Sequence, residues 1–205
     1  MVQPLNYLKE SPSQTAGPYV HIGLAPGAAG FQTFATELGQ NLAPAGVPGE
    51  RIHIEGMVYD GLNTPVKDIL IEVWQADASG IYPHPEDPRV ADCANGFRGW
   101  GRVISDFDTG LYAFDTIKPG PVPGRAGQTQ APHLSLWLVS RGINIGLNTR
   151  MYFPEDRALH AADPVLGSIE QRARVATLIG TVTGPGHYRF DIHLQGDSET
   201  VFIDI

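Results

Sequence analysis

The chain has 205 residues, with 14 Lys or Arg against 22 Asp or Glu, and is therefore acidic, with a formal net charge of −8. This balance, without any run of basic residues, argues against binding to nucleic acids or to a membrane surface. The single cysteine, Cys93, leaves no internal disulfide and favours a reducing compartment. The first ten residues lack the apolar stretch of a signal peptide or membrane span, so we expect a cytoplasmic protein.

The first half of the chain predicts an arm followed by strands. Residues 1–50 are rich in turn residues and predict an N-terminal arm, with a short helix over 31–42. Alternating apolar residues then predict strands at 51–60, with Gly56 as a bulge, and at 69–77.

The second half continues this pattern with one clear helix. Residues 101–117 predict a hairpin turning at Asp108-Thr109-Gly110. A helix is predicted to begin with Asp163 as N-cap and Pro164 as first residue, and to run to 179. Further strands are predicted at 131–139, 148–153, 187–196 and 200–205. Many short strands separated by turns predict a mainly β protein: a β-sandwich over 51–205, with the 1–50 arm part of the same unit and one or two short helices.

The densest group of possible metal ligands lies in IYPHPEDPR, which contains Tyr82, His84, Glu86 and Asp87. Three prolines in this stretch favour a surface loop whose polar residues are simply solvated. Cys93 has no evident base beside it and is interpreted as a structural thiol.

The strand APHLSLWLV, residues 131–139, places His133 and Ser135 on one face. Residues two apart on a strand are separated by ~6.5–7 Å, so two histidines in these positions would reach one metal ion. Here the second position is serine.

Five segments in order resemble the intradiol ring-cleavage dioxygenases: DILIEVWQADASGIY, GWGR, GLYAFDTIKPGPVPG, APHLSL and YRFDIHLQGDSETVFIDI. The resemblance runs from about residue 11 to the C-terminus. It implies a β-sandwich fold and, in catalytic chains, a non-haem ferric ion held by two tyrosines and two histidines. It also implies a reaction in which O₂ opens a catechol ring between its two hydroxyl-bearing carbons.

The resemblance leaves this chain with half of that ligand set. Tyr82 matches the first tyrosine and His133 the first histidine, while Val122 and Ser135 stand at the second tyrosine and second histidine positions. Valine offers no donor atom, and a neutral hydroxyl is a poor substitute for imidazole. The resemblance therefore implies no metal ligand set and no catalytic residue in this chain.

The resemblance further implies a homologous partner chain that binds the Fe(III), and a higher-order oligomer of such pairs. The active site then lies in a cleft between the two chains and accepts O₂ and a small aromatic substrate, 3,4-dihydroxybenzoate. Thr15, Gly17 and Arg141 are the candidates for binding this carboxylated substrate. Arg141 lies eight residues beyond His133, ~27 Å along an extended strand, and so can serve only a second cleft. Taken alone, the three residues favour a solvated N-terminal loop and a surface arginine, and only the resemblance makes substrate binding an equal alternative.

Two other hypotheses remain open at this stage. The chain is alternatively a non-catalytic, homo-oligomeric β-sandwich that binds aromatic ligands. It is otherwise an active enzyme whose metal is held by Tyr82 together with His84 or His187.

Overall fold

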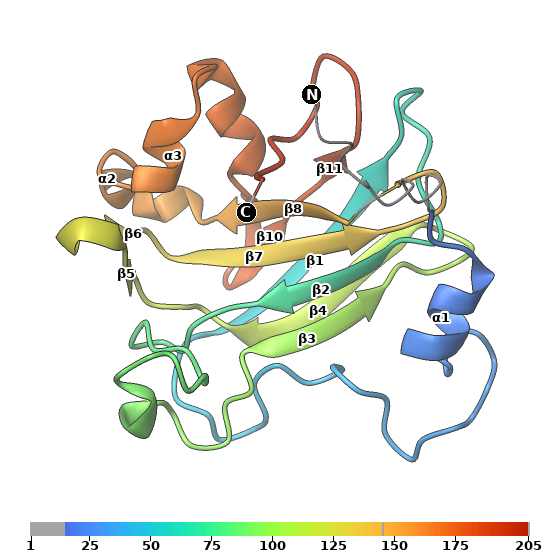
Figure 1. Cartoon of the computed structure of the whole chain (residues 1–205), viewed down its shortest axis with the longest axis horizontal. Helices are drawn as coiled ribbons and strands as arrows, with labels where there is room; N and C mark the ends of the chain where they lie inside the picture. Colours follow the sequence, from blue (N-terminus) through green and yellow to red (C-terminus); the bar gives the residue numbers. More distant parts are fainter. Residues whose placement is uncertain (1–14, 145, 205) are drawn as a thin grey trace, which may run out of the picture.

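The structure is a computed structural model that describes residues 15–144 and 146–204, so the first 14 residues of the predicted arm lie outside the described residues. Two β-sheets pack face to face and confirm the mainly β prediction (Figure 1). The first sheet contains β1 (Arg51–Tyr59), β4 (Leu111–Ile117), β9 (Thr181–Gly184), β10 (His187–Arg189) and β11 (Ile192–His193). The second contains β2 (Leu70–Trp74), β3 (Trp100–Ile104), β7 (His133–Val139) and β8 (Leu147–Tyr152). A separate pair is formed by β5 (Val122–Pro123) and β6 (Thr129–Gln130).

Each sheet turns one face inward, as the alternation in the sequence predicts. On β7 the residues Leu134, Leu136 and Leu138 are buried in the core, while Ser135 and Trp137 point to the outer face and are only partly buried. The core between the sheets is completed chiefly by Ile52, Ile54, Val58, Ile71, Val73, Phe114, Met151, Phe153 and Ile192. This packing leaves the outer face of the second sheet available to carry a site.

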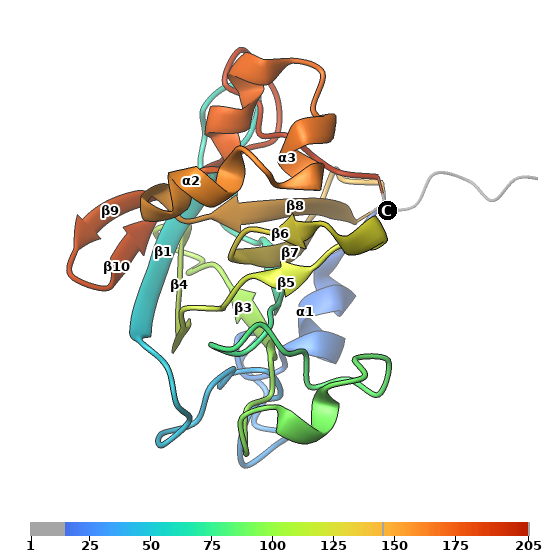
Figure 2. The same ribbon diagram turned by 90° about the vertical axis from the view of Figure 1, so that its left-hand side faces the viewer.

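The helices are short and lie at the ends of the second sheet. They are α1 (Pro18–Leu24), α2 (Arg157–His160), α3 (Pro164–Ser168) and the 3₁₀ segments η1 (Val90–Asp92), η2 (Arg125–Gly127), η3 (Pro154–Asp156) and η4 (Arg172–Leu178). Figure 2 shows α2 and α3 on the side of β8, with α1 on the opposite side. Within the described residues, no helix is long and apolar enough to cross a membrane.

The helix predicted over 164–179 is wrong in its length. Asp163 is the N-cap as predicted and accepts hydrogen bonds from the backbone N–H groups of Val165 and Leu166, at 2.8 and 2.9 Å. The helix ends at Ser168 because the next residue, Ile169, is extended, with φ −74° and ψ 110°. The Ser168 hydroxyl and the Arg172 guanidinium then donate hydrogen bonds to the carbonyls of Val165 and Leu166 in the last turn. The chain resumes helical turns only as η4.

The helix predicted over 31–42 is also wrong, because this stretch consists of turns and bends. Phe31 and Phe34 are each 51% exposed, so they provide no apolar face to bury. Gly39 has a positive φ of 83°, and its carbonyl accepts a hydrogen bond of 2.9 Å from Arg102 N on β3. Pairing with the edge of β3 thus replaces the helical hydrogen bonds.

The predicted hairpin over 101–117 is wrong, although the turn is correctly placed. β3 pairs with β2 and β4 pairs with β1, so the turn passes from one sheet to the other. The Asp106 carboxylate stabilises it by accepting hydrogen bonds from the backbone N–H groups of Asp108 and Thr109.

Two further predictions about strands are corrected. Gly56 is not a bulge, because β1 pairs with β4 without interruption from Arg51 to Met57. Glycine is required there for close approach, since a Cβ atom would lie 2.0 Å from the carbonyl oxygen of Phe190. Residues 200–204 form no strand; Ile203 N makes one hydrogen bond of 2.8 Å to Asn148 O beside β8.

Candidate functional site

The four positions that correspond to iron ligands converge at one end of the second sheet. Tyr82, in the loop after β2, stacks on Trp74 with ring centroids 5.7 Å apart and planes 6° apart. Trp74 is paired in register with Ser135, two residues after His133. Val122 is buried on β5, and the next residue, Pro123, lines a cavity of about 360 Å³ together with Tyr82 and Trp74.

His133 is enclosed and electrically neutral. Its side chain is 3% exposed, and its Nδ1 lies 2.7 Å from the carbonyl oxygen of Ala131. A carbonyl only accepts hydrogen bonds, so Nδ1 carries the proton and Nε2 is unprotonated. Nε2 has no hydrogen-bond partner among the described residues. Burial, aided by the nearby charge of Arg150, lowers the pKa of His133 to about 4.

A cationic side chain, Arg150, lies on the strand next to position 135, where the family pattern has its second histidine. Arg150 on β8 is the in-register partner of Ser135. Its Nη1 donates to the side-chain oxygen of Gln130 at 2.6 Å and to the Tyr152 hydroxyl at 3.3 Å. Burial raises the pKa of Tyr82 even though the Arg150 charge favours its ionised form. The Tyr82 phenol is therefore protonated at neutral pH and is not a tyrosinate.

These residues do not fit a ferric ion. Two of the four positions lack a suitable donor atom, and the nearby Arg150 guanidinium repels a second cation. Within 15–144 and 146–204, no group of three or more His, Cys, Asp and Glu side chains is placed to hold a metal.

The alternative ligands do not complete a metal site either. His84 lies edge-on to Trp74 at 6.2 Å, whereas His187 begins β10 in the other sheet and lies 5.2 Å from His53. His187 thus belongs to the first sheet, whereas Tyr82 lies in the loop that follows β2 of the second sheet.

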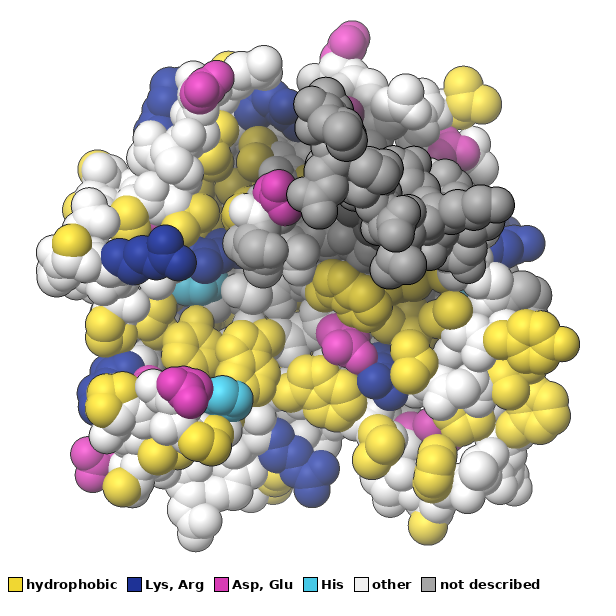
Figure 3. All heavy atoms as spheres, viewed as in Figure 1, with side chains coloured by type: hydrophobic (Ala, Val, Ile, Leu, Met, Phe, Trp, Pro, Cys, Tyr) yellow, Lys and Arg dark blue, Asp and Glu magenta, His cyan; other side chains and the backbone are white. Residues whose placement is uncertain are grey.

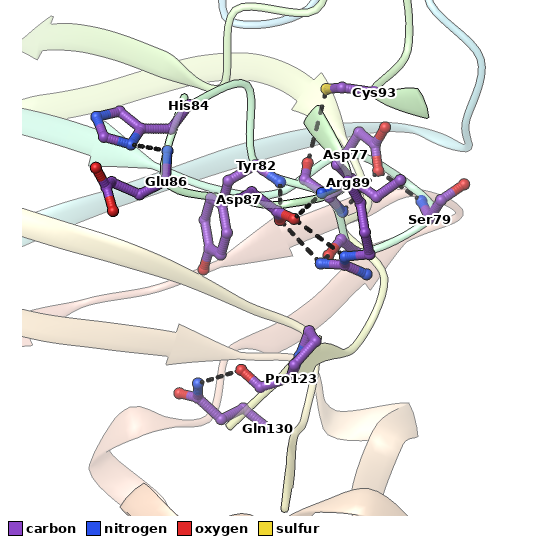
Figure 4. A network of polar contacts seen from close by, with 12 residues as sticks. Asp77, Ser79, Tyr82, His84, Glu86, Asp87, Arg89, Cys93, Pro123 and Gln130 are labelled. Atoms are coloured by element: carbon purple, nitrogen blue, oxygen red, sulfur yellow. Dashed lines mark hydrogen bonds and ion pairs between the residues drawn. The ribbon is translucent and has the colours of Figure 1, made fainter. Parts of the chain in front are cut away.

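The loop around Tyr82 is held by its own ion pair (Figure 4). The Arg89 guanidinium donates to Asp87 at 2.9 and 3.1 Å, and this hydrogen bonding lowers the pKa of Asp87 to about 2. Burial raises the pKa of Cys93 to about 11, which makes its thiol a poor nucleophile. The polar residues of this loop therefore stabilise the loop itself.

The three predicted substrate-binding residues lie together at the far end of the sheet. Thr15 Oγ1 accepts a hydrogen bond of 2.8 Å from the backbone N–H of Gly142, 127 residues later in the sequence. Gly17 and Arg141 line one cavity of about 310 Å³. The Arg141 guanidinium is 70% exposed and is paired through Nε with Asp68. We call this cavity the arm pocket.

The arm pocket contains one residue, His21, that the sequence patterns did not indicate. His21 on α1 lines it, is 8% exposed, and packs edge-on against Phe107 at 5.5 Å. Its Nε2 has no partner among the described residues, and burial lowers its pKa. Its position four residues after Gly17, one helical turn away, was the available signal.

The similarity of this chain to known proteins assigns it to a family. A family model described as Dioxygenase matches residues 32–196. The chain is 48% identical over 204 residues to the protocatechuate 3,4-dioxygenase alpha chain of Pseudomonas putida, covering 98% of this chain and 99% of that protein. This chain belongs to the intradiol dioxygenase family. It is also 38% identical over 173 residues to the protocatechuate 3,4-dioxygenase beta chain of Burkholderia cepacia, covering 80% of this chain and 73% of that protein.

The fold agrees with this assignment. The dioxygenase domain of a carbohydrate-binding protein fusion from Streptomyces sp. SirexAA-E matches with a TM-score of 0.53 and 24% identity, covering 78% of this chain and 86% of that chain. The intradiol dioxygenase family depends on iron. As a member of the family, this chain retains the fold and two ligand-type residues, and it places Arg150 opposite Ser135, one of the two changed positions.

Proposed function

We propose that this chain is the iron-free α subunit of protocatechuate 3,4-dioxygenase. In this role it assembles with a homologous iron-binding β chain, in a higher-order oligomer in the cytoplasm. The assembled enzyme cleaves 3,4-dihydroxybenzoate with O₂ to 3-carboxy-cis,cis-muconate. The ferric ion and its chemistry belong to the β chain, and this chain supplies part of the wall of the cleft.

One observation carries the proposal: the family's iron-ligand positions are incomplete in a chain that otherwise keeps the family's fold. Val122 is buried and has no donor atom, and Ser135 is the in-register partner of the cationic Arg150, so neither position suits a metal ion. Similarity over nearly the full length to an alpha chain supports the same assignment.

The arm pocket is our candidate for the surface that meets the substrate. The Arg141 Nε donates to Asp68. This leaves the two terminal nitrogens of the guanidinium available to bind a ligand. A guanidinium presents paired donors that match a carboxylate, the group that distinguishes 3,4-dihydroxybenzoate from catechol. Thr15 ties the arm to the turn that carries Arg141, so the arm and the cation are positioned together.

Co-expression with a homologous chain that carries the complete ligand set tests this function. We expect O₂ uptake with 3,4-dihydroxybenzoate only when both chains are present, and one iron per pair. Tyr82→Phe in this chain is a sharp internal test, because removing one hydroxyl is expected to leave both the iron content and the activity of the pair unchanged. Ring cleavage and stoichiometric iron in this chain alone, or loss of iron in the Tyr82→Phe pair, would reject the proposal.

A further inference from the structure

Among residues 15–144 and 146–204, Arg150 forms no direct ion pair. Its Nη1 donates to Gln130 and to the Tyr152 hydroxyl, which in turn donates to the buried Asp163 carboxylate at 3.4 Å. The side chain is partly buried, so it has also lost some of its hydration. A guanidinium that is partly desolvated and has no carboxylate in direct contact keeps donors that can bind an anion.

Arg150 is one of the residues that line a cavity with aromatic walls, which we call the tryptophan pocket. The pocket has a volume of about 340 Å³ on the outer face of the second sheet. Its apolar walls are the chain's three tryptophans, Trp74, Trp100 and Trp137, and its polar groups include Ser135 and Arg150. Figure 3 shows a band of apolar side chains across this face, with charged groups set among them.

The second charged residue that lines the tryptophan pocket is neutralised by an ion pair. Glu72 also lines the tryptophan pocket, but its Oε1 accepts hydrogen bonds from Arg102 Nε at 3.0 Å and Nη2 at 2.7 Å. Its carboxylate is therefore neutralised by Arg102. Of the two charged residues that line the tryptophan pocket, Arg150 is the one without an ion pair among the described residues.

We propose that the tryptophan pocket binds a small aromatic carboxylate, with its carboxylate on Arg150 and its ring against the tryptophans. The volume is at the lower end of the ~300–1,000 Å³ range of small-molecule sites and suits a single substituted ring. An inorganic anion would use Arg150 but leave the aromatic walls without a partner. A neutral ring would use the walls but leave the charge unpaired. This inference goes beyond the proposed function, because it concerns a ligand of this chain itself.

Binding of benzoate to the full-length chain tests the proposal by calorimetry. We expect Arg150→Gln to weaken benzoate binding at least tenfold, which corresponds to 1.4 kcal/mol at 25 °C. Arg150→Lys keeps the charge but not the paired donors, so its affinity for benzoate is expected to lie between those of the native chain and Arg150→Gln. Arg157→Gln is the matched control, because Arg157 is exposed on α2 and forms no ion pair with any described residue. Benzamide, which has the same ring without the charge, is expected to bind at least tenfold more weakly than benzoate.

Crystals soaked with 4-bromobenzoate locate the ligand independently of any variant. We expect anomalous bromine density among the three tryptophans, with the carboxylate on Arg150. The proposal is overturned by density elsewhere, by a protein segment filling the pocket, by equal binding of benzamide, or by benzoate affinity unchanged in Arg150→Gln. Ring-cleavage activity of the assembled enzyme is measured separately, so failure of benzoate binding leaves the proposed function standing, and the reverse also holds.

Discussion

Restoring the missing ligand types alone is expected to fail to create an iron site in this chain. Val122→Tyr and Ser135→His together supply the second tyrosine and second histidine of the family pattern. We expect this double variant to bind iron only weakly. Arg150 is the in-register partner of position 135, and its positive charge repels the ion.

The magnitude follows from the strand pairing. For an order-of-magnitude estimate, we take the separation between an ion at position 135 and the Arg150 charge as about 5.5 Å, the Cβ spacing of a directly opposed cross-strand pair. A ferric ion bound by two tyrosinates retains one net positive charge. Two unit charges at about 5.5 Å repel by roughly 3 kcal/mol at an effective dielectric constant of about 20. This corresponds to a loss of affinity of about 150-fold.

Burial at position 122 adds a second cost. Val122 is 2% exposed, and inserting a tyrosine into such a site typically costs about 1–3 kcal/mol. This cost is common to every variant that carries the tyrosine, so it cancels when variants with and without Arg150 are compared.

The assay measures iron per chain by mass spectrometry, together with the visible absorbance of tyrosinate-bound ferric ion. We expect iron to bind at least tenfold more tightly when Arg150→Gln is added to the double variant. Arg157→Gln, added in its place, is the charge-matched control and is expected to have no such effect. Equal iron affinity in the double variant and in the variant with Arg150→Gln would refute the electrostatic reasoning.

Three more predictions concern substrate, packing and pH. In the assembled enzyme, Arg141→Ala is expected to raise KM for 3,4-dihydroxybenzoate about 10- to 100-fold, from ~1.5–3 kcal/mol for a charged hydrogen bond, with little change for catechol; an equal loss for both substrates contradicts carboxylate binding. Gly56→Ala is expected to destabilise the chain by about 3 kcal/mol or more in urea denaturation, because its Cβ would overlap the Phe190 carbonyl. Gly167→Ala, with no atom within 4 Å of the added Cβ, is the control and should be nearly neutral. Below pH 6.5, the native chain should lose stability that His133→Gln retains.

Alternation of apolar residues was sufficient to predict the strands that form the core. It succeeded for 131–139 and 148–153 because one face of each strand is buried between the sheets and the other is not. It did not specify the partners of each strand, which is why 101–117 was interpreted as a hairpin. Both arms of that turn alternate equally well, and only packing assigns them to different sheets.

The site shows the same division between local and long-range information. The missing iron ligands are visible in the sequence because the family pattern is local to Val122 and Ser135. The role of Arg150 is not visible, since it depends on which residue of β8 pairs with Ser135. The hydrogen bond between Thr15 and Gly142 likewise joins parts of the chain that no local pattern connects. The assignment of Thr15, Gly17 and Arg141 to substrate binding stays a prediction, as does the division into a 1–50 arm and a 51–205 domain.

The pH dependence of His133 follows from its burial. Its pKa is lowered from an ordinary value of 6.5 to about 4, so below pH 6.5 the unfolded chain takes up a proton that the folded chain refuses. The stability that comes from keeping His133 neutral is therefore fully present above pH 6.5 and is lost as the pH falls toward 4. Each unit between the two pKa values is worth about 1.36 kcal/mol, so the full loss is roughly 3 kcal/mol. His133→Gln cannot be protonated and lacks this component, while its carboxylates titrate as in the native chain. Urea denaturation at several pH values should show the stability advantage of the native chain over His133→Gln shrinking by roughly this amount from pH 7 to pH 4. A difference that stays constant over this range would mean that the imidazole accepts a proton in the folded chain, and that His133 is not sealed from solvent.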